Sequence, residues 1–358
     1  MSAKKQKVIV GLSGGVDSSV SCALLKDQGY EVEAIFMKNW TPKSKEEGLI
    51  ICPLTADEKD ARLTASQLGL KLNVISFEED YRREVVENLF QEYQAGRTPN
   101  PDVLCNSKVK FKVFFTKALE LGADFIATGH YARKSEINGQ YRLLKGLDKN
   151  KDQTYFLYQI TQEKLAKTLF PIGEYEKSQV RKLADKFGLA TAKKPDSQGI
   201  CFVGEVAMKE FLKQRIKPKT GEILTVDGQK IGEHEGVWYY TIGQRKGIGV
   251  GGGLPYYVVN KDLEKNLLIV ARGDQDEALF KKETIVSEAH WISGAEPKFP
   301  LNCQVKIRYR QNDQECAVKK IKQGLRVTFK EPQRAVTPGQ FAVFYDNEIC
   351  LGGGKIIK

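Results

Sequence analysis

The first two hundred residues alternate short apolar runs with longer amphipathic segments. The apolar runs predict buried strands at residues 7–10, 32–36, 72–77 and 124–128. The segments between them carry apolar side chains at helical spacing and predict helices at 18–28, 55–68, 81–93 and 109–121. A polar loop is expected at 94–107. This alternation is typical of a parallel sheet covered by helices, which binds ligands beyond the carboxyl ends of its strands.

The pattern changes after this α/β part. Asn138-Gly139 predicts a hairpin over residues 131–145, and helices are expected at 154–167, 178–187 and 206–214. Short strands separated by turn residues follow, and after about residue 283 they dominate, at 305–309, 318–321, 325–329, 341–345 and 349–351. We therefore expect three domains, 1–204, 205–279 and 280–358.

Composition narrows the class of protein. Of 358 residues, 41% are hydrophobic and 28% charged, as in folded globular proteins. No apolar run approaches the roughly 18 residues that span a bilayer, and no signal peptide follows the basic start, so a cytoplasmic protein with no membrane partner is expected. The net charge of +11 favours a polyanionic partner such as nucleic acid, although a basic surface also serves solubility alone.

Cysteine usage adds a second constraint. The seven cysteines are scattered, and there is no Cys-x-x-Cys and only three histidines. This favours free thiols in a reducing compartment and argues against a structural zinc site.

The turn after the first strand carries the sharpest local signal. It reads Gly11-Leu12-Ser13-Gly14-Gly15-Val16-Asp17-Ser18-Ser19. Glycines bring backbone amides close to a ligand, and the following helix N-terminus attracts an anion, so the loop is a candidate phosphate site. Asp17 can cap the helix or hold Mg²⁺ beside phosphates. The alternative is a glycine-rich turn that only starts the helix.

The loop matches neither a Walker A motif nor a dinucleotide fingerprint. It resembles the pyrophosphate loop of the N-type ATP pyrophosphatases. That resemblance implies cleavage of ATP between its α and β phosphates, adenylation of a substrate oxygen, and displacement of AMP by a nucleophile.

Two cysteines lie in glycine- or proline-containing polar segments. Cys105 precedes a basic helix and follows Asp102 by three residues, and Cys201 lies in the segment 196–202. Nearby lysines and a helix N-terminus favour the thiolate of Cys105. Both cysteines are candidate reactive thiols because they are expected in polar loops rather than in the core. Cys22 and Cys350 are instead expected to be small hydrophobic residues buried in the core.

These segments resemble the tRNA-specific 2-thiouridylases, the MnmA type, nearly from end to end. The matching motifs are Asn100-Pro101-Asp102-x-x-Cys105-Asn106, Ala127-Thr128-Gly129-His130-Tyr131, Lys151-Asp152-Gln153-Thr154-Tyr155-Phe156-Leu157, Gly199-Ile200-Cys201-Phe202, Tyr240-Thr241-Ile242-Gly243-Gln244-Arg245-Lys246-Gly247, Arg308-Tyr309-Arg310 and Pro338-Gly339-Gln340. The resemblance implies a Rossmann-like ATP-pyrophosphatase domain, a small central β-rich domain, and a C-terminal β-barrel that contacts tRNA.

The resemblance also implies roles for single residues. Residues Gly11 to Ser18, with Met37 and Gly129, would bind ATP, and Asn100, Pro101 and Asp102 the target base. The tRNA contacts would be His130, Lys151, Asp152, Gln153, Arg308, Tyr309 and Gln340. No protein cluster is expected to hold a metal, and Mg²⁺ would accompany ATP.

The implied reaction is thiolation of the wobble uridine in the anticodon of tRNAs for Lys, Glu and Gln. Cys201 would carry sulfur as a persulfide from a donor protein, a cysteine desulfurase or a relay protein. Cys105 would be the nucleophile, either freeing sulfide by forming a disulfide with Cys201 or attacking the carbon directly. Asp102 would orient the base and shuttle a proton.

Three alternatives remain at this point. Another ATP pyrophosphatase, such as an argininosuccinate-synthetase-like enzyme, would use the same loop without a cysteine pair. A non-catalytic RNA-binding protein would also be basic. Asp102, Cys105 and Cys201 could instead ligate an iron–sulfur cluster. The glycine-rich stretch 243–253 fits a loop that closes on tRNA or a string of turns equally well.

Overall fold

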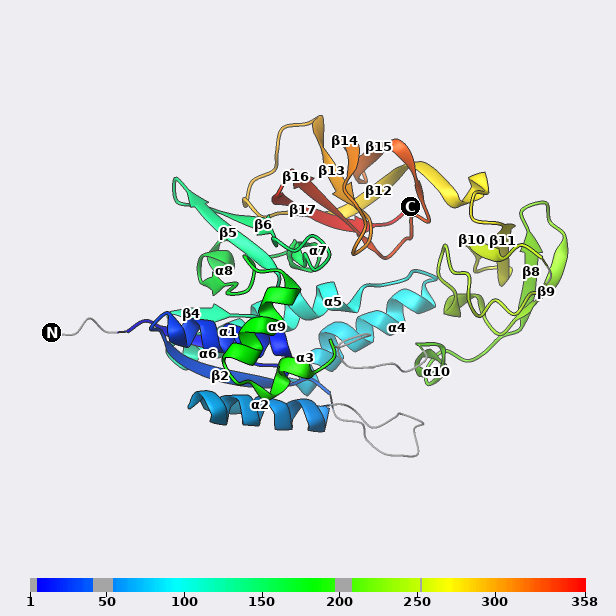
Figure 1. Ribbon diagram of the computed structural model, residues 1–358. Helices are drawn as coiled ribbons and strands as arrows, with labels where there is room; N and C mark the ends of the chain where they lie inside the picture. Colours follow the sequence, from blue (N-terminus) through cyan, green and yellow to red (C-terminus); the bar gives the residue numbers. More distant parts are fainter. Residues whose placement is uncertain (1–4, 41–53, 197–207, 252) are drawn as a thin grey trace.

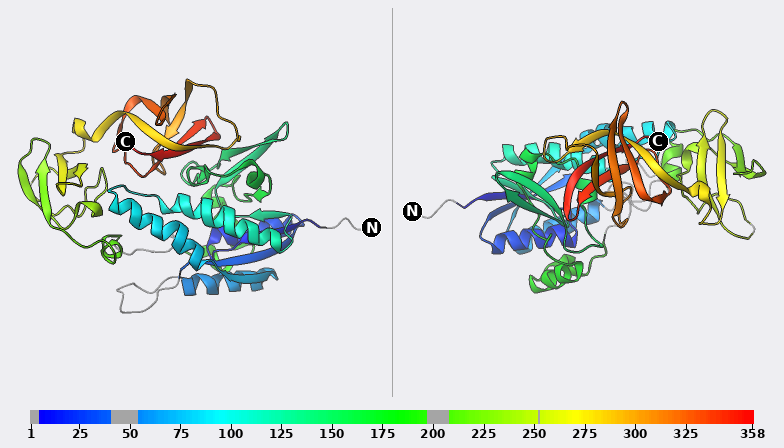
Figure 2. Two further views of the ribbon diagram at one scale, coloured as in Figure 1. Left: turned by 180° about the vertical axis from the view of Figure 1, so that it is seen from behind. Right: turned by 90° about the horizontal axis from the view of Figure 1, so that it is seen from above.

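The structure is a computed structural model that describes residues 5–40, 54–196, 208–251 and 253–358. It contains an α/β part, a small four-stranded sheet and a C-terminal barrel (Figure 1). The four-stranded sheet lies beside one end of the α/β part, and the barrel lies along one side of both (Figure 2). In the described residues no helix has the length and apolarity needed to cross a membrane.

The sheet of the α/β part is fully parallel. Its order is β3-β2-β1-β4-β7, with bounds β1 Lys7–Gly11, β2 Glu31–Lys38, β3 Lys71–Ser76, β4 Phe125–Ala127 and β7 Thr168–Leu169. Val8, Ile9 and Val10 of the central strand are fully buried, because helices cover both faces. The predicted α/β class is confirmed.

The helices divide between the two faces. Val8 and Val10 pack with α1 (Val16–Asp27) and α2 (Leu54–Leu68). Ile9 on the opposite face packs with two long helical segments, residues 78–94 and 101–120. Their parts are α3 Glu78–Tyr81, η2 Arg82–Val86, α4 Glu87–Gln94, α5 Pro101–Leu104, η3 Cys105–Phe114 and α6 Phe115–Glu120.

The second long segment begins earlier than the sequence pattern predicted. The polar loop expected at 94–107 is wrong, because the helix starts at Pro101. The Asn100 side chain accepts a hydrogen bond from the amide of Val103 at 3.3 Å, and proline suits the first helical position. Residues 105–114 are π-helical, with a kink at Phe111 (φ −90°, ψ 18°).

The hairpin predicted at Asn138-Gly139 is confirmed, with both residues at positive φ, 52° and 75°. Its strands are β5 Ala132–Ile137 and β6 Gln140–Lys145, and β6 pairs with β17 of the barrel. The single helix predicted at 154–167 is wrong: two short helices form instead, α7 Thr154–Leu157 and α8 Gln162–Ala166. Later helices are α9 Lys177–Lys186 and η4 Ala190–Lys193.

The four-stranded sheet has the order β10-β11-β8-β9. Its elements are α10 Met208–Lys213, β8 Gly221–Thr225, β9 Lys230–His234, η5 Val237–Tyr239, β10 Tyr256–Asp262 and β11 Leu267–Arg272. Phe211 of α10 stacks on Phe90 of α4 with ring centroids 5.2 Å apart, which fixes this part to the α/β part. The described residues between η5 and β10 form turns.

Six antiparallel strands close the C-terminal barrel, since β12 pairs with both β15 and β17. Its elements are η6 Glu277–Leu279, β12 Phe280–Trp291, β13 Leu301–Lys306, β14 Gln314–Ile321, β15 Gly324–Arg334, β16 Phe341–Asp346 and β17 Ile349–Ile356. The strand predicted at 305–309 ends at Lys306, because the chain turns there and Arg310 adopts a positive φ of 62°.

Candidate active site

The glycine-rich loop connects β1 to the N-terminus of α1. Ser18 Oγ accepts the amide N–H of Ser13 at 3.1 Å and donates to the carbonyl of Gly15 at 3.1 Å. Gly14 has φ +77°, and a Cβ there would lie 2.1 Å from the backbone oxygen of Asp57. The loop therefore requires glycine at this position, and its shape is held by its own serines.

The N-terminus of α1 is open to an anion. Gly15 is the N-cap and supplies no side-chain acceptor, so the first-turn amides carry no side-chain cap. Asp17 does not cap the helix. Orphan amides and the positive end of the helix dipole suit a phosphate group.

Asp17 is instead held by a network. Lys177 Nζ lies 2.7 Å and 2.9 Å from its two carboxylate oxygens, and the Tyr131 hydroxyl donates to one of them at 2.8 Å. Lys177 also pairs with Asp196 at 2.8 Å. Asp17 was predicted to lie at the phosphates, but Lys177, 160 positions away, was not predicted as its partner.

Asp196 collects three cations. Lys151 lies 2.6 Å and Arg181 2.8 Å from it, in addition to Lys177. Burial alone would raise the pKa of Asp196, but the hydrogen bonds and charges of Lys151 and Lys177 outweigh it and lower the pKa to about 2. The carboxylate is thus ionised at neutral pH.

Lys194 ties the loop to α2. Its ammonium donates to the carbonyl of Gly14 at 3.0 Å and pairs with Asp57 and Asp60 of α2. The hydrogen bonds to the two carboxylates raise the pKa of Lys194 against the effect of burial. Lys194 therefore connects the backbone of the loop to the acidic side chains of α2.

Three more predicted ATP residues gather at the loop. A Cβ on Gly11 would lie 3.3 Å from Met37 Cε at the end of β2, and one on Gly129 would lie 2.7 Å from the amide nitrogen of Ser18. Gly129 follows β4, so all three lie at the carboxyl edge of neighbouring strands, where the sheet topology predicts a ligand.

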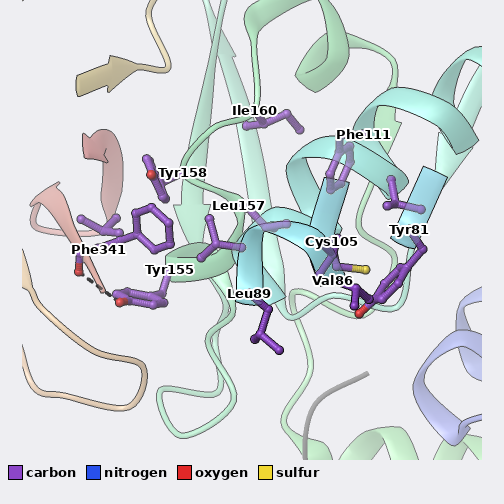
Figure 3. Close-up of a cluster of buried hydrophobic side chains, with 14 of the residues drawn as sticks. Tyr81, Val86, Leu89, Cys105, Phe111, Tyr155, Leu157, Tyr158, Ile160 and Phe341 are labelled. Carbon is purple, nitrogen blue, oxygen red and sulfur yellow. Dashed lines mark hydrogen bonds between the residues drawn. The ribbon is translucent and has the colours of Figure 1, made fainter. Parts of the chain in front are cut away.

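The predicted nucleophile Cys105 lies inside a helix, not in a polar loop. It is 1% exposed and belongs to an apolar cluster with Tyr81, Val86 and Leu89 (Figure 3). Further along the helix Phe114 reaches the loop, 3.5 Å from the Cβ position of Gly11. The helix thus joins the thiol to the phosphate loop, and Cys201 lies outside the described residues.

Asn100 and Asp102 lie at the start of this helix. Asp102 is half-buried, and its carbonyl accepts a hydrogen bond from Asn106 Nδ2 at 2.9 Å. Asn100 Nδ2 reaches Gln340 Oε1 of the barrel at 3.4 Å, and Gln340 Nε2 donates to the carbonyls of Thr98 and Pro99. Gln340, a predicted tRNA contact, therefore lies against the predicted target-base residues.

Several predicted tRNA contacts have internal partners. Asp152 is 5% exposed and accepts hydrogen bonds from Thr154 Oγ1 and Lys306 Nζ. Gln153 Oε1 accepts the amide of Tyr131 at 3.0 Å. His130 is buried beside Thr128, and burial, with the nearby charge of Lys110, lowers the pKa of His130 well below its usual value. These three side chains shape the site from inside.

Arg308 and Tyr309 lie on the turn after β13. Tyr309 packs on Phe156 with centroids 4.4 Å apart, and Arg308 donates to the carbonyl of Arg334 at 2.8 Å. Burial and the charge of Arg334 lower the pKa of Arg308. Arg334 also stacks on the Tyr257 ring at 4.7 Å. Arg334 was not predicted from the sequence, and it adds a second cation beside Arg308.

In the part of the chain that the structure describes, side chains able to ligate a metal are dispersed. Across residues 5–40, 54–196, 208–251 and 253–358, no three His, Cys, Asp or Glu side chains gather in a way that could hold a metal ion. An iron–sulfur site at Asp102, Cys105 and Cys201 involves a residue outside those ranges.

Comparison with known proteins identifies the family. The family described as the tRNA methyl transferase HUP domain matches residues 6–205, and the companion PRC-barrel and aminomethyltransferase β-barrel families match residues 209–272 and 281–356. The tRNA-specific 2-thiouridylase MnmA of a Marinomonas species is 53% identical over 98% of this chain and 91% of that protein. The chain belongs to the MnmA family.

A second MnmA, from Pseudomonas fluorescens, is 53% identical over 99% of this chain and 95% of its own length. Full-length MnmA relatives thus match all three parts of the fold. The MnmA resemblance stated from the motifs is confirmed. The roles of single residues and the domain boundaries remain predictions.

Proposed function

We propose that this chain forms 2-thiouridine in tRNA, using ATP to activate the 2-carbonyl of the wobble uridine and cysteine-bound sulfur to replace its oxygen. The observation that carries the proposal is the helix that starts at Pro101 and connects Cys105 to Phe114, whose ring packs against Gly11 of the phosphate loop. Membership of the MnmA family, across the whole chain, supports it.

The loop residues Gly11 to Ser18, with Met37 and Gly129, would hold ATP with its phosphates at the N-terminus of α1. A uracil oxygen is a poor leaving group, and its adenylate leaves readily as AMP. Asp17 Oδ2 accepts one hydrogen bond, from Lys177, which leaves it room to ligate Mg²⁺. Mg²⁺ bound there would neutralise charge on the phosphates.

The target base would lie against Asn100, Pro101 and Asp102, flipped out of the anticodon stack. Asp102, half-buried at the first turn of the helix, would orient the base and move a proton. Gln340 would act on the base through this loop, since its amide donates to the carbonyls of Thr98 and Pro99.

Sulfur would arrive as a persulfide on Cys201, loaded by a donor protein. Attack of the Cys105 thiolate on Cys201 Sγ forms a disulfide and releases hydrosulfide, which displaces AMP from the base. In the other route the terminal sulfur of the Cys201 persulfide attacks the base carbon and displaces AMP. The Cys105 thiolate then attacks Cys201 Sγ, which breaks its bond to the transferred sulfur, frees the thiolated base and forms the same disulfide. A reductant then reduces the Cys105–Cys201 disulfide and restores both thiols. Either route needs Cys105 to become accessible from its buried position when tRNA binds.

The basic surface at Arg308 and Arg334, together with Lys151, would contact the tRNA backbone. By family the substrates would be the tRNAs for Lys, Glu and Gln.

The test is incubation with unmodified tRNA, ATP, Mg²⁺ and a persulfide donor, with thiolated tRNA detected by its slowed migration in a mercury-containing gel. Cys105→Ser and Cys201→Ser should each abolish the shifted band while ATP still binds. Cys303→Ser is the matched control and should retain it. A shifted band that survives in either active-site variant would overturn the role given to that thiol, and absence of tRNA-dependent AMP release in the unaltered protein would favour a binding protein.

A further inference from the structure

Two cysteines of the barrel face each other across neighbouring strands. Cys303 of β13 and Cys316 of β14 are register partners in an antiparallel pair, and their sulfur atoms lie 3.7 Å apart. Neither residue belongs to the site described above. Both pack with the apolar interior of the barrel, around Val305 and Val318.

The geometry suits a disulfide. Directly opposed residues of an antiparallel pair have Cα atoms about 4.5–5.5 Å apart, within the range of about 4.4–6.8 Å that disulfides span. A bond length of about 2.05 Å requires the sulfurs to approach by roughly 1.7 Å, which side-chain rotation supplies without moving the strands.

The two thiols differ in access. Cys316 is 7% exposed, whereas Cys303 is only half-buried. The hydrogen bond with Cys303, together with burial, raises the pKa of the Cys316 thiol. Cys303 is therefore the thiol that reacts first with an oxidant. Cys316 is the resolving thiol, which then attacks the oxidised Cys303.

We propose that Cys303 and Cys316 form a reversible redox pair that staples β13 to β14. The Cys303 thiolate attacks one sulfur of a small disulfide such as oxidised glutathione, which forms a mixed disulfide and expels one thiolate. Cys316 loses its proton and attacks the Cys303 sulfur, which closes the protein disulfide and expels the second thiolate. The two protein thiols lose two electrons, and the small disulfide becomes two thiols.

The staple lies at the base of one particular turn. Residues 307–313 connect β13 to β14, and they include Arg308 and Tyr309. A covalent link between the two strands restricts their splaying and so limits the motion of this turn. The consequence for tRNA rests on the proposed function, whereas closure of the disulfide does not.

The experiment equilibrates the full-length protein with oxidised glutathione, blocks remaining thiols with iodoacetamide and maps the peptides by mass spectrometry without reduction. The expected product is a Cys303–Cys316 cross-linked peptide that dithiothreitol releases. Cys303→Ser and Cys316→Ser should lose it, and Cys350→Ser should retain it. Two alkylated thiols, or a glutathione adduct that persists on Cys303, would overturn the proposal.

Hydrogen exchange of residues 307–313 tests the mechanical part without reference to activity. We expect exchange in this turn to slow several-fold in the oxidised protein and to return on reduction. In Cys316→Ser the exchange rates of residues 307–313 should be the same with and without the oxidant. Equal rates in the oxidised and reduced protein would show that the bond does not staple the turn, whatever its effect on thiolation of tRNA.

Discussion

Gln340 of the barrel donates its side-chain N–H to the backbone oxygen of Thr98 in the α/β part, across 2.9 Å. The same nitrogen lies 3.0 Å from the carbonyl of Pro99, and the amide of Thr98 donates to Pro338 at 2.9 Å. The barrel therefore fixes the backbone that leads into the predicted target-base residues.

We expect Gln340→Ala to lower kcat/KM for tRNA thiolation about tenfold, because each lost hydrogen bond contributes about 1 kcal/mol and the loop before Asn100 loosens. ATP affinity should stay unchanged. Gln323→Ala, in an exposed turn of the same barrel, is the control. Calorimetry with ATP and single-turnover thiolation give the two readouts. Reduced tRNA affinity with unaltered hydrogen exchange at residues 97–100 would identify Gln340 as a direct tRNA contact instead.

Gly14→Ala should weaken ATP binding by about 2 kcal/mol, because alanine at φ +77° is strained and its Cβ would meet the Asp57 oxygen. Gly139→Ala is a matched control: φ is +75°, yet nothing lies within 4 Å of the Cβ position. It should show the backbone strain alone, as a small loss of thermal stability with normal ATP affinity. Equal ATP affinities in the two variants would contradict a structural role for the loop.

The local parts of this site could be predicted from the sequence, because they depend on neighbours in the chain. The phosphate loop and the Asn138-Gly139 hairpin follow from glycine and asparagine conformations alone. The start of the helix at Pro101 could also have been predicted, because Asn100 followed by proline is a helix-start signal. The polar composition of the segment favoured a loop instead.

The long-range contacts could not be predicted. Lys177 meets Asp17 only because α9 packs on α1, and residues 160 positions apart leave no periodic signal. The burial of Cys105 likewise depends on the 78–94 helix, which supplies Tyr81 and Val86. The polar residues on either side of Cys105 predicted a loop, whereas the packing that buries the thiol comes from residues distant in sequence.

Lys177→Met should raise the dissociation constant for ATP at least tenfold. The change leaves the Asp17 carboxylate without its ammonium partner beside the phosphate site, so the two negative charges repel. Lys177→Arg should recover part of the affinity. Lys182→Met on the exposed side of α9 removes the same charge away from the loop and should bind ATP normally. If both methionine variants lose affinity equally, net charge and not this contact governs binding.

Glu92 joins the α/β part to the barrel through two cations. Glu92 is 5% exposed, and its carboxylate lies 2.7 Å from Arg97 and 2.8 Å from Lys355 of β17. Burial would raise the pKa of Glu92, but the hydrogen bonds from Arg97 and Lys355 prevail and lower it. In the unfolded chain a glutamate titrates near pH 4.3.

These pKa values set the sign of the pH dependence. Above about pH 4.3 both states are ionised and the full stabilisation from Glu92 is present. As the pH falls below that value the unfolded chain takes up the proton first, so the stabilisation declines towards the lower pKa of the folded protein. We expect Glu92→Gln to cost about 2 kcal/mol at pH 7 and to flatten the loss of stability between pH 5 and pH 3.

Urea unfolding at a series of pH values measures both effects, and Glu264→Gln, on an exposed turn, controls for loss of one negative charge. The control should follow the unaltered protein at every pH. Glu92 pairs with Lys355 of β17, and the next residue, Ile356, exchanges backbone hydrogen bonds with Gly339 and Gln340 in the turn before β16. Loss of the Glu92 carboxylate should therefore also weaken thiolation without changing ATP affinity. An unchanged pH profile in Glu92→Gln would show that the carboxylate stabilises neither the fold nor the junction between the two parts.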